Sequence, residues 1–343
     1  MDNITHSLFA LTLAGAGLRR AGRGSTTALL IASNIPDIEI LTAFTGGRVG
    51  YLAAHRGPTH GPLGLGLAVA TAAGVWLARR TFWRGERSAT FLSLLAVSVV
   101  GFIGHIALDL ATSYGTRVLS PFWDTWYGVD WMPIIDVYLW AILTAGVVAG
   151  MMRPALRQRI ALCALALMAG DYTLRAAAHT VALREAVSIQ QATLPGSVGR
   201  VDQVFHYLNA EDPAALPAAL PTFFSPFRWR LVLRSPEGFK VEEVDLAGRG
   251  SPEDVITFPD ERGGVVARAS TARLARIFLD FSRFPAAEAI PHQNGDVTVH
   301  WYDLRFAERP SGPGDGRQHT SPFGVWVRLS PTGAIVAQQL GPG

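Results

Sequence analysis

Residues 89–112 read ATFLSLLAVSVVGFIGHIALDLAT, and this stretch decides the fold. The run is long enough to cross about 30 Å of hydrocarbon, yet it carries an imidazole, His105, and a carboxylate, Asp109. An ionisable group near the centre of a membrane helix costs about 2.5–3.5 kcal/mol on insertion scales and usually marks a functional position. The stretch therefore predicts a membrane helix with a polar site on one of its faces.

Similar apolar runs fill the first half of the chain. Of its 343 residues, 49% are hydrophobic and 17% are charged, which is too apolar for an ordinary water-soluble protein. We predict six membrane helices, at residues 6–21, 26–44, 61–79, 89–112, 131–152 and 157–178. We expect the first helix to be retained; a signal peptide is the alternative, but its basic segment and cleavage site are missing.

The second half has the composition of a water-soluble region. In four short stretches apolar and polar residues alternate, and β-branched and aromatic residues are frequent. This pattern predicts strands at 229–234, 241–246, 297–303 and 325–329. Residues 271–281 have helical spacing. The predicted fold is mostly α: a polytopic transmembrane helical bundle (1–185), followed by a smaller extramembrane α+β domain (186–343) with an antiparallel sheet.

Arginines in the loops predict the orientation. Ten arginines follow the first, third and fifth predicted helices: Arg19, Arg20, Arg23, Arg79, Arg80, Arg84, Arg87, Arg153, Arg157 and Arg159. The opposite loops hold only Arg48, Arg56 and Arg117. The positive-inside rule makes the first set cytoplasmic, so the C-terminal domain is expected on the periplasmic side of a bacterial inner membrane. This distribution explains the basic charge without a nucleic-acid partner.

The ionisable residues of the predicted helices gather toward the periplasmic side. They are His6, Asp37, Glu39, His105, Asp109 and Asp136. His105 and Asp109 are four residues apart and therefore share one helix face, which suits two ligands of one metal or a hydrogen-bonded structural pair. Pro36 predicts a break in the second helix, which is tolerated where it lines protein or a watery cavity.

A second polar motif lies between two apolar runs, at His55-Arg56-Gly57-Pro58-Thr59-His60. The Gly-Pro pair predicts a turn, so both histidines could face one point. With the helix residues they form a set of nitrogen and oxygen donors without thiolate, because Cys163 lies in an apolar run. Such a set suits a catalytic divalent metal, Zn²⁺ first and Mn²⁺ or Fe²⁺ as alternatives.

The residues of the predicted site fall into metal ligands, catalytic residues and candidates for binding a substrate anion. The expected metal ligands are His6, Asp37, His60, His105 and Asp109. The expected catalytic residues are His55, Arg56, Glu39 and Asp136, of which His55, Glu39 and Asp136 could be further ligands or bases. Arg56 and Arg117 are candidates for binding a substrate anion, since arginine binds phosphate in a bidentate manner, although either could pair with a carboxylate instead.

An ordered set of motifs resembles the YdjM-like family of inner-membrane proteins, which are regarded as metal-dependent hydrolases. The motifs are MDNITHS at 1–7, NIPDIE at 34–39, HRGPTH at 55–60, GHIALD at 104–109, TSYGT at 112–116 and PIID at 133–136. The resemblance covers about residues 1–185. The segments SPFRWR at 225–230, SRFP at 282–285 and YDLR at 302–305 look like the C-terminal region of one branch.

Two positions depart from the family pattern. Glu39 stands where a second aspartate is usual, which keeps the charge, and Gly61 stands where a serine is usual, which removes a hydroxyl. More remotely, the pattern is similar to zinc-dependent phospholipase C, an all-α phosphodiesterase fold. That resemblance implies hydrolysis of a phosphoester.

The sequence thus predicts a membrane-bound metal-dependent hydrolase that acts, by metal-activated water, on a phosphoester or other ester of a lipid or lipid-linked substrate. A lipid partner follows from a site at headgroup depth. The alternative is a transporter or metal-handling protein, but the helix ends toward the cytoplasm are apolar up to the arginines. In a third hypothesis the metal is structural and the C-terminal domain carries a binding function.

Overall fold

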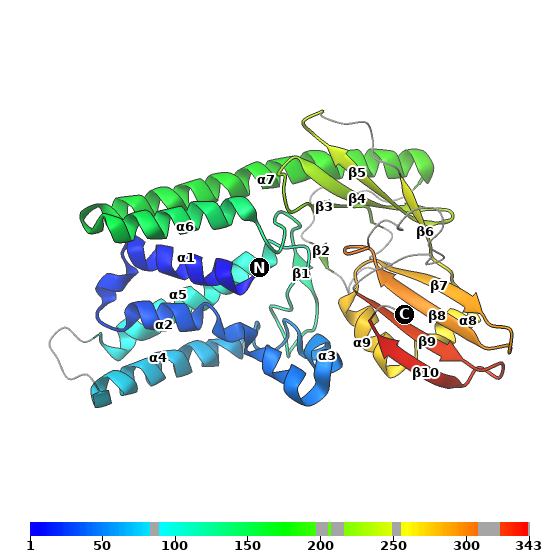
Figure 1. Ribbon diagram of the computed structural model, residues 1–343, viewed down its shortest axis with the longest axis horizontal. Coiled ribbons are helices and arrows are strands. Elements are labelled where there is room, and N and C mark those ends of the chain that lie inside the picture. Colours follow the sequence, from blue (N-terminus) through cyan, green and yellow to red (C-terminus); the bar gives the residue numbers. More distant parts are fainter. Residues whose placement is uncertain (83–88, 197–204, 207–215, 249–254, 308–322, 342–343) are drawn as a thin grey trace.

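The computed structural model describes residues 1–82, 89–196, 205–206, 216–248, 255–307 and 323–341. A helical N-terminal region is followed by a C-terminal region built from antiparallel sheets (Figure 1). Arg84 and Arg87 of the predicted topology lie outside the described residues.

Each of the six predicted membrane segments contains helix. The helices are α1 Asn3–Ala16, α2 Ser25–Ala32, α4 Gly64–Phe82, α5 Phe91–Leu110, α6 Val137–Met152 and α7 Arg157–Thr193. Among the described residues, two helices are long and apolar enough to cross a bilayer, α5 and the Pro154–Thr193 segment, or three if α2 and the bent segment after it count as one span. The apolar helices fit a membrane protein, while α1 and α6 have only 14 and 16 residues.

The break predicted at Pro36 is present, and it divides the predicted helix 26–44 into separate elements. α2 ends at Ala32, the 3-10 helix η2 runs Ile35–Leu41, and a further helix, α3 Thr42–Ala54, follows where we expected a loop. The side chain of Asn34 donates to the carbonyl of Leu30 (2.9 Å) at this break, and Pro36 has no N–H for a helical bond. The break brings Asp37 and Glu39 next to His60.

α7 is longer than the predicted 157–178. It continues to Thr193, and alanines one turn apart, Ala178, Ala182 and Ala186, pack against Trp229 and neighbouring residues of the sheet. His179 therefore lies inside the helix rather than at its end, with its ring 5.4 Å from that of Trp229. The predicted domain division at residue 185 falls within α7, whose last turns pack against the first sheet.

Two four-stranded antiparallel sheets form the C-terminal region. One has the order β3-β4-β5-β6: β3 Ala218–Pro221, β4 Arg228–Ser235, β5 Gly238–Asp245 and β6 Ile256–Pro259. The other has the order β10-β9-β8-β7: β7 Pro285–Pro291, β8 Val297–Asp303, β9 Gly324–Leu329 and β10 Ile335–Leu340. The helices α8 Gly264–Ala269 and α9 Arg273–Phe281 pack on the second sheet, and β1 Tyr127–Gly128 pairs with β2 Phe205–His206. The predicted strands and the helix at 271–281 are confirmed.

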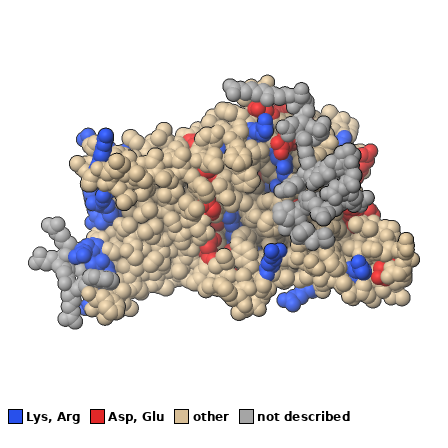
Figure 2. All heavy atoms as spheres, viewed as in Figure 1, with Lys and Arg blue, Asp and Glu red and all other residues tan. Residues whose placement is uncertain are grey.

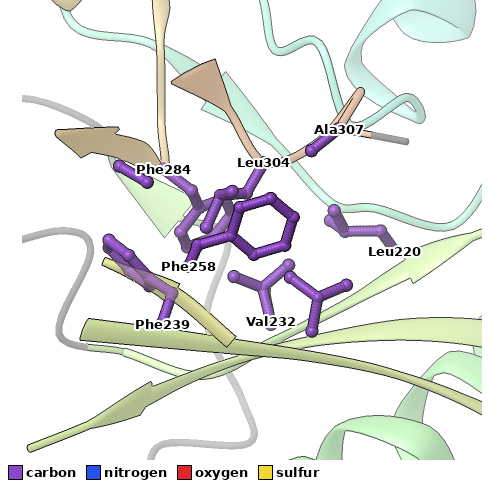
Figure 3. Close-up of a cluster of buried hydrophobic side chains, with 10 residues drawn as sticks. Leu220, Val232, Phe239, Phe258, Phe284, Leu304 and Ala307 are labelled. Carbon is purple, nitrogen blue, oxygen red and sulfur yellow. The ribbon is translucent and has the colours of Figure 1, made fainter. Parts of the chain in front are cut away.

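Buried phenylalanines join the two sheets. Phe239 and Phe258 of the first sheet meet Phe284 and Leu304 beside the second (Figure 3). All four side chains are at most 1% exposed. Burial of side chains of this size contributes about 1.5–3 kcal/mol each relative to leaving them in water. The two sheets therefore share a core and form one unit.

Buried arginines attach this unit to the loop after α5. Arg305 donates to the carbonyls of Ser113 and Tyr114 (3.1 and 3.2 Å), and Arg283 pairs with Asp130 (2.6 Å). The loop that carries the TSYGT motif is thus enclosed between the helices and the sheets.

Figure 2 shows that Lys and Arg side chains gather at the opposite end of the helical region, away from the sheets.

Gly61 gives a test of how tightly the 55–61 loop packs. A Cβ on Gly61 would collide with the backbone carbonyl of Ser120, whereas a Cβ on Gly66 would meet open space. We expect Gly61→Ala to destabilise the protein by about 1–3 kcal/mol, the typical cost of overpacking. Thermal unfolding in detergent should show a lower Tm than for wild type, with Gly66→Ala as the matched control. Equal Tm values for both variants would contradict this packing.

Candidate metal centre

Four side chains from three segments converge at the end of the helical region nearest the sheets. Asp37 comes from η2, His60 from the loop before α4, and His105 and Asp109 from α5. One ligand atom from each lies within 4.8 Å of all the others. His60, His105 and Asp109 are at most 1% exposed, whereas the side chain of Asp37 is 24% exposed. The cluster thus has one open side.

The distances within the cluster fit a tetrahedral metal site. Nε2 of His60 lies 3.1 Å from Nε2 of His105 and 3.3 Å from Oδ2 of Asp109. Nε2 of His105 lies 3.4 Å from that oxygen, and Oδ1 of Asp37 lies 3.6 and 3.7 Å from the two nitrogens. Ligand bonds of 2.0–2.2 Å imply ligand separations of about 3.4 Å around a tetrahedral ion. These five separations therefore leave the space of one such ion between four donors.

Hydrogen bonds on the outer nitrogens fix how the two imidazoles face each other. Nδ1 of His105 donates to the carbonyl of Ser33 (2.9 Å), and Nδ1 of His60 faces Oε2 of Glu39 (3.4 Å). Nδ1 of His60 donates to the hydroxyl oxygen of Thr59 (3.1 Å), because that hydroxyl gives its own proton to Glu39 (2.9 Å). In the neutral rings each Nδ1 therefore carries the proton, and each Nε2 presents a lone pair. Two such lone pairs 3.1 Å apart beside two carboxylates need a positive charge between them, which is a bound metal ion or, without one, the proton that the raised pKa of His60 keeps on its ring.

Glu39 links this cluster to the HRGPTH loop. It accepts from the backbone N–H of Arg56 (2.7 Å) and the hydroxyl of Thr59 (2.9 Å), and it pairs with Nδ1 of His55 (3.0 Å). Its two oxygens thus hold both ends of the loop. A carboxylate that fixes the tautomer of a metal-binding histidine is a common outer partner in metal sites.

The helical region that carries the cluster matches a known protein family. The profile of the YdjM inner membrane protein family matches residues 1–181, which include the four clustered residues. The chain belongs to this family. The uncharacterized protein YfhP of Bacillus subtilis is similar, with 27% identity over 148 residues, and the alignment covers 40% of this chain and 43% of YfhP. No solved structure matches.

In this member of the YdjM family, Arg56 is bound by the protein itself. Its guanidinium contacts Oδ1 of Asp109 (3.0 Å), the hydroxyl of Thr112 (3.1 Å) and the carbonyl of Gly115 (2.9 Å), and the residue is 4% exposed. Arg117 likewise donates to the carbonyls of Ala53 and His55 (3.1 and 2.8 Å). These contacts favour a role for Arg56 in positioning Asp109, so that Oδ2 remains for a metal.

His6 lies beside the four-residue cluster. Its ring stacks on that of His105 with centroids 3.8 Å apart, and its Nε2 is 3.4 Å from Oδ1 of Asp109. Among the described residues, neither ring nitrogen of His6 has a hydrogen-bond partner. The amino group of Met1 contacts the same oxygen of Asp109. Because Arg56 already balances Oδ1, the arrangement favours a single metal on Oδ2 with His6 at its side.

Asp136 lies apart from the cluster contacts. Its Oδ1 accepts from the N–H of Leu139 (2.8 Å) and so caps α6, and the carboxylate forms a fully buried ion pair with Arg175. Asp171 also lies 3.6 Å from Arg175, as its i+4 spacing predicts. The contacts of Asp136 favour a structural role at the start of α6.

Some residues around the cluster were not predicted from the sequence. The carbonyl of Ser33 orients His105, and a backbone group leaves no signal in the sequence. Thr59, which contacts both Glu39 and Nδ1 of His60 (2.9 and 3.1 Å), could have been found, since its hydroxyl is part of the quoted motif. Thr112 and Gly115 belong to TSYGT, and they contact Arg56 rather than a metal ligand.

The electrostatics around His60 predict how metal affinity depends on pH. Burial alone would lower the pKa of His60, but hydrogen bonds with Asp109, Asp37 and Glu39 outweigh it and raise the pKa to about 10. At neutral pH a metal must therefore displace a proton from this imidazole. Raising the pH removes that proton, so the apparent Kd for Zn²⁺ should fall by about tenfold per pH unit between about pH 6.5 and 8.5.

Competition titrations of Zn²⁺ against a chelator at three pH values measure this slope. A Kd that does not change with pH, after correction for the protonation of the chelator, would contradict the predicted proton release.

Glu39 provides a second test. Glu39→Gln keeps the shape of the side chain but removes the charge that orients His55 and His60. We expect metal affinity to fall by about 10–100-fold, as for other outer partners of metal ligands. The same chelator competition measures it, and Glu243→Gln, in β5 of the sheet region, is the control. Wild-type affinity in Glu39→Gln would contradict the role assigned to this carboxylate.

Proposed function

We propose that this protein is a membrane-bound metal-dependent hydrolase that cleaves a phosphoester or other ester of a lipid or lipid-linked substrate. The observation that carries the proposal is the pair of imidazole lone pairs facing each other beside two carboxylates. A proton can satisfy one such pair, but four converging donors suit a metal ion. Membership of the YdjM family supports a metal-dependent enzyme in a membrane.

His60, His105, Asp37 and Asp109 would hold the ion. Two imidazoles, two carboxylates and no thiolate suit Zn²⁺, with Mn²⁺ and Fe²⁺ as the alternatives. A bound Zn²⁺ would supply a Lewis acid and a water whose pKa is lowered to about 7. Asp37 is the exposed member of the set, so substrate and water would approach the cluster beside it.

Three of the other predicted residues, Arg56, Glu39 and His55, act on the cluster or next to it. Arg56 holds Asp109 and leaves a positive charge close to the site, where negative charge would develop in the transition state. Glu39 keeps the Nε2 lone pair of His60 directed inward, as the carbonyl of Ser33 does for His105. His55 pairs with the other oxygen of Glu39, and it lines a cavity next to the site, where a substrate could bind.

The location favours a lipid substrate. The cluster lies at the end of α5 that adjoins the C-terminal region. Figure 2 shows that Lys and Arg side chains gather at the other end of the helical region. If that end faces the cytoplasm, as the loop charges predict, the cluster and the C-terminal region lie on the periplasmic side of a multi-pass inner-membrane protein. A site at this depth would meet lipid headgroups, and a nucleic-acid partner is not part of the proposal.

The second candidate is a transporter or a metal-handling membrane protein. The same four donors could bind an ion in transit. Transport needs a polar path across the bundle, and the buried residues below the cluster on α5 are Leu94, Val97, Ser98, Gly101 and Phe102. The mainly apolar character of these buried residues favours the hydrolase.

Metal analysis followed by an activity panel tests the proposal. Detergent-solubilised wild type should contain about one equivalent of metal per chain, and with that metal it should hydrolyse at least one member of a panel of phosphodiesters and phospholipids. His105→Ala and Asp37→Asn should lose both the metal and the activity, because each removes one of the four ligands. His292→Ala, in the sheet region, should retain both.

Absence of metal from the folded wild type would overturn the proposal. A full equivalent of metal without hydrolysis, together with metal uptake into proteoliposomes, would favour the transporter instead.

A further inference from the structure

The loop between β3 and β4 carries three exposed phenylalanines. Phe223, Phe224 and Phe227 are 49%, 77% and 40% exposed, and residues 216–227 include no charged side chain. Exposed apolar groups that gather in one place usually mark a surface that contacts another protein or a membrane. The loop is therefore a candidate interaction surface of the C-terminal region.

Hydrogen bonds within the loop fix its shape. The hydroxyl of Thr222 donates to the carbonyl of Arg228 (2.9 Å), and the N–H of Phe227 donates to the hydroxyl of Ser225 (3.2 Å). These bonds close the turn between the two strands from the inside. The phenylalanines are thus exposed because of the shape of the turn itself.

α6 places the loop at the end of the membrane helices. The phenol of Tyr138, in the first turn of α6, donates to the carbonyl of Phe224 (3.1 Å). α6 has no charged residue, and Arg153 follows its last residue. Its 16 residues extend about 24 Å, which is less than the roughly 30 Å of hydrocarbon in a bilayer. With Arg153 at the headgroup level on one side, the hydrocarbon extends past Tyr138 on the other, to the level of Phe224.

α7 gives the same depth independently. β4 lies beside the second half of α7 (Figure 1), and the ring of Trp229, just after the loop, is 5.4 Å from that of His179. His179 comes 20 residues after Arg159, which is about 30 Å along a helix. The next charged side chain that α7 exposes is Arg184. The base of the loop thus lies where α7 leaves the hydrocarbon.

This depth selects lipid as the partner of the loop. Phe224 is exposed at a level where α6 and α7 are surrounded by a bilayer, so lipid is already next to its ring. Aromatic side chains are typical of both boundaries of a membrane, and the apolar faces of interfacial segments enter it by about 5–10 Å. A second copy of the chain, the other kind of partner for an apolar surface, would first have to displace that lipid.

We propose that the loop 222–227 inserts into the bilayer leaflet nearest the sheets, with Phe223, Phe224 and Phe227 among the lipid chains just below the headgroups. The loop attaches the first sheet directly to the membrane surface. The proposal goes beyond the proposed hydrolase and does not depend on it. It rests on membership of an inner membrane protein family and on the lengths of α6 and α7.

Spin labels on the full-length protein in proteoliposomes measure the depth of the loop. Cys163→Ser first removes the single cysteine. A nitroxide attached to Phe224→Cys should collide more often with oxygen, which concentrates in hydrocarbon, than with a water-soluble nickel chelate. The matched site is Gln293→Cys, at an exposed position between β7 and β8, where the order of the two collision rates should be reversed.

Two results would overturn the proposal. One is a preference for the nickel chelate at both positions, which would place the loop in water. The other is a label at position 224 that is shielded from both reagents, which would show that a protein covers the loop.

Charged variants test whether the phenylalanines themselves hold the loop in the bilayer. With the label kept at position 224, Phe223→Asp combined with Phe227→Asp should raise its collisions with the nickel chelate, because a carboxylate among lipid chains is unfavourable. Val336→Asp, at an exposed position in β10, should leave them unchanged. A label at Gln293→Cys in the double variant should keep its parent accessibility, which shows that the sheets remain folded. An unchanged preference for oxygen at position 224 in the double variant would contradict the assigned role.

Discussion

The structure depends on one electrostatic constraint: two imidazole lone pairs and two carboxylates are held within a few ångströms of each other, and three of these four side chains are at most 1% exposed. Burial makes unbalanced charge expensive. Arg56 balances the charge on one oxygen of Asp109, and the other oxygen remains inside the cluster. The helix break before Asp37 and the turn before His60 serve to bring these donors to α5.

Much of this could be predicted from the sequence, because ionisable residues in apolar runs are conspicuous. His105 and Asp109 share a face because they are four residues apart, and the strands and α9 follow from their periodicity. α3 was missed because glycines and an arginine interrupt its apolar pattern, and the end of α7 was missed because polar residues follow the membrane run. Both are held by tertiary contacts, which lie outside the reach of local patterns.

The roles of the predicted residues were harder to assign than their proximity. Arg56 reads as an anion-binding group, yet backbone carbonyls and Thr112 use its donors. Gly61 reads as the loss of a serine hydroxyl, yet the carbonyl of Ser120 leaves no room for any side chain there. Asp136 reads as an ion-binding group, and it meets Arg175, which lies 39 residues further on and a full helix away. In each case the deciding partner is a backbone group or a residue distant in sequence.

The continuity of α7 has a mechanical consequence. At 1.5 Å per residue its 37 residues extend about 55 Å, from the arginine-rich end of the bundle to the far side of the first sheet. α7 thus connects the helical region rigidly to the first sheet. The hydrogen bonds of Arg305 to the loop after α5 are a second attachment between the two regions. These two attachments oppose a hinge motion of the C-terminal region relative to the helices. Water and substrate would then reach the buried donors past the exposed side of Asp37, without a hinge opening of the C-terminal region.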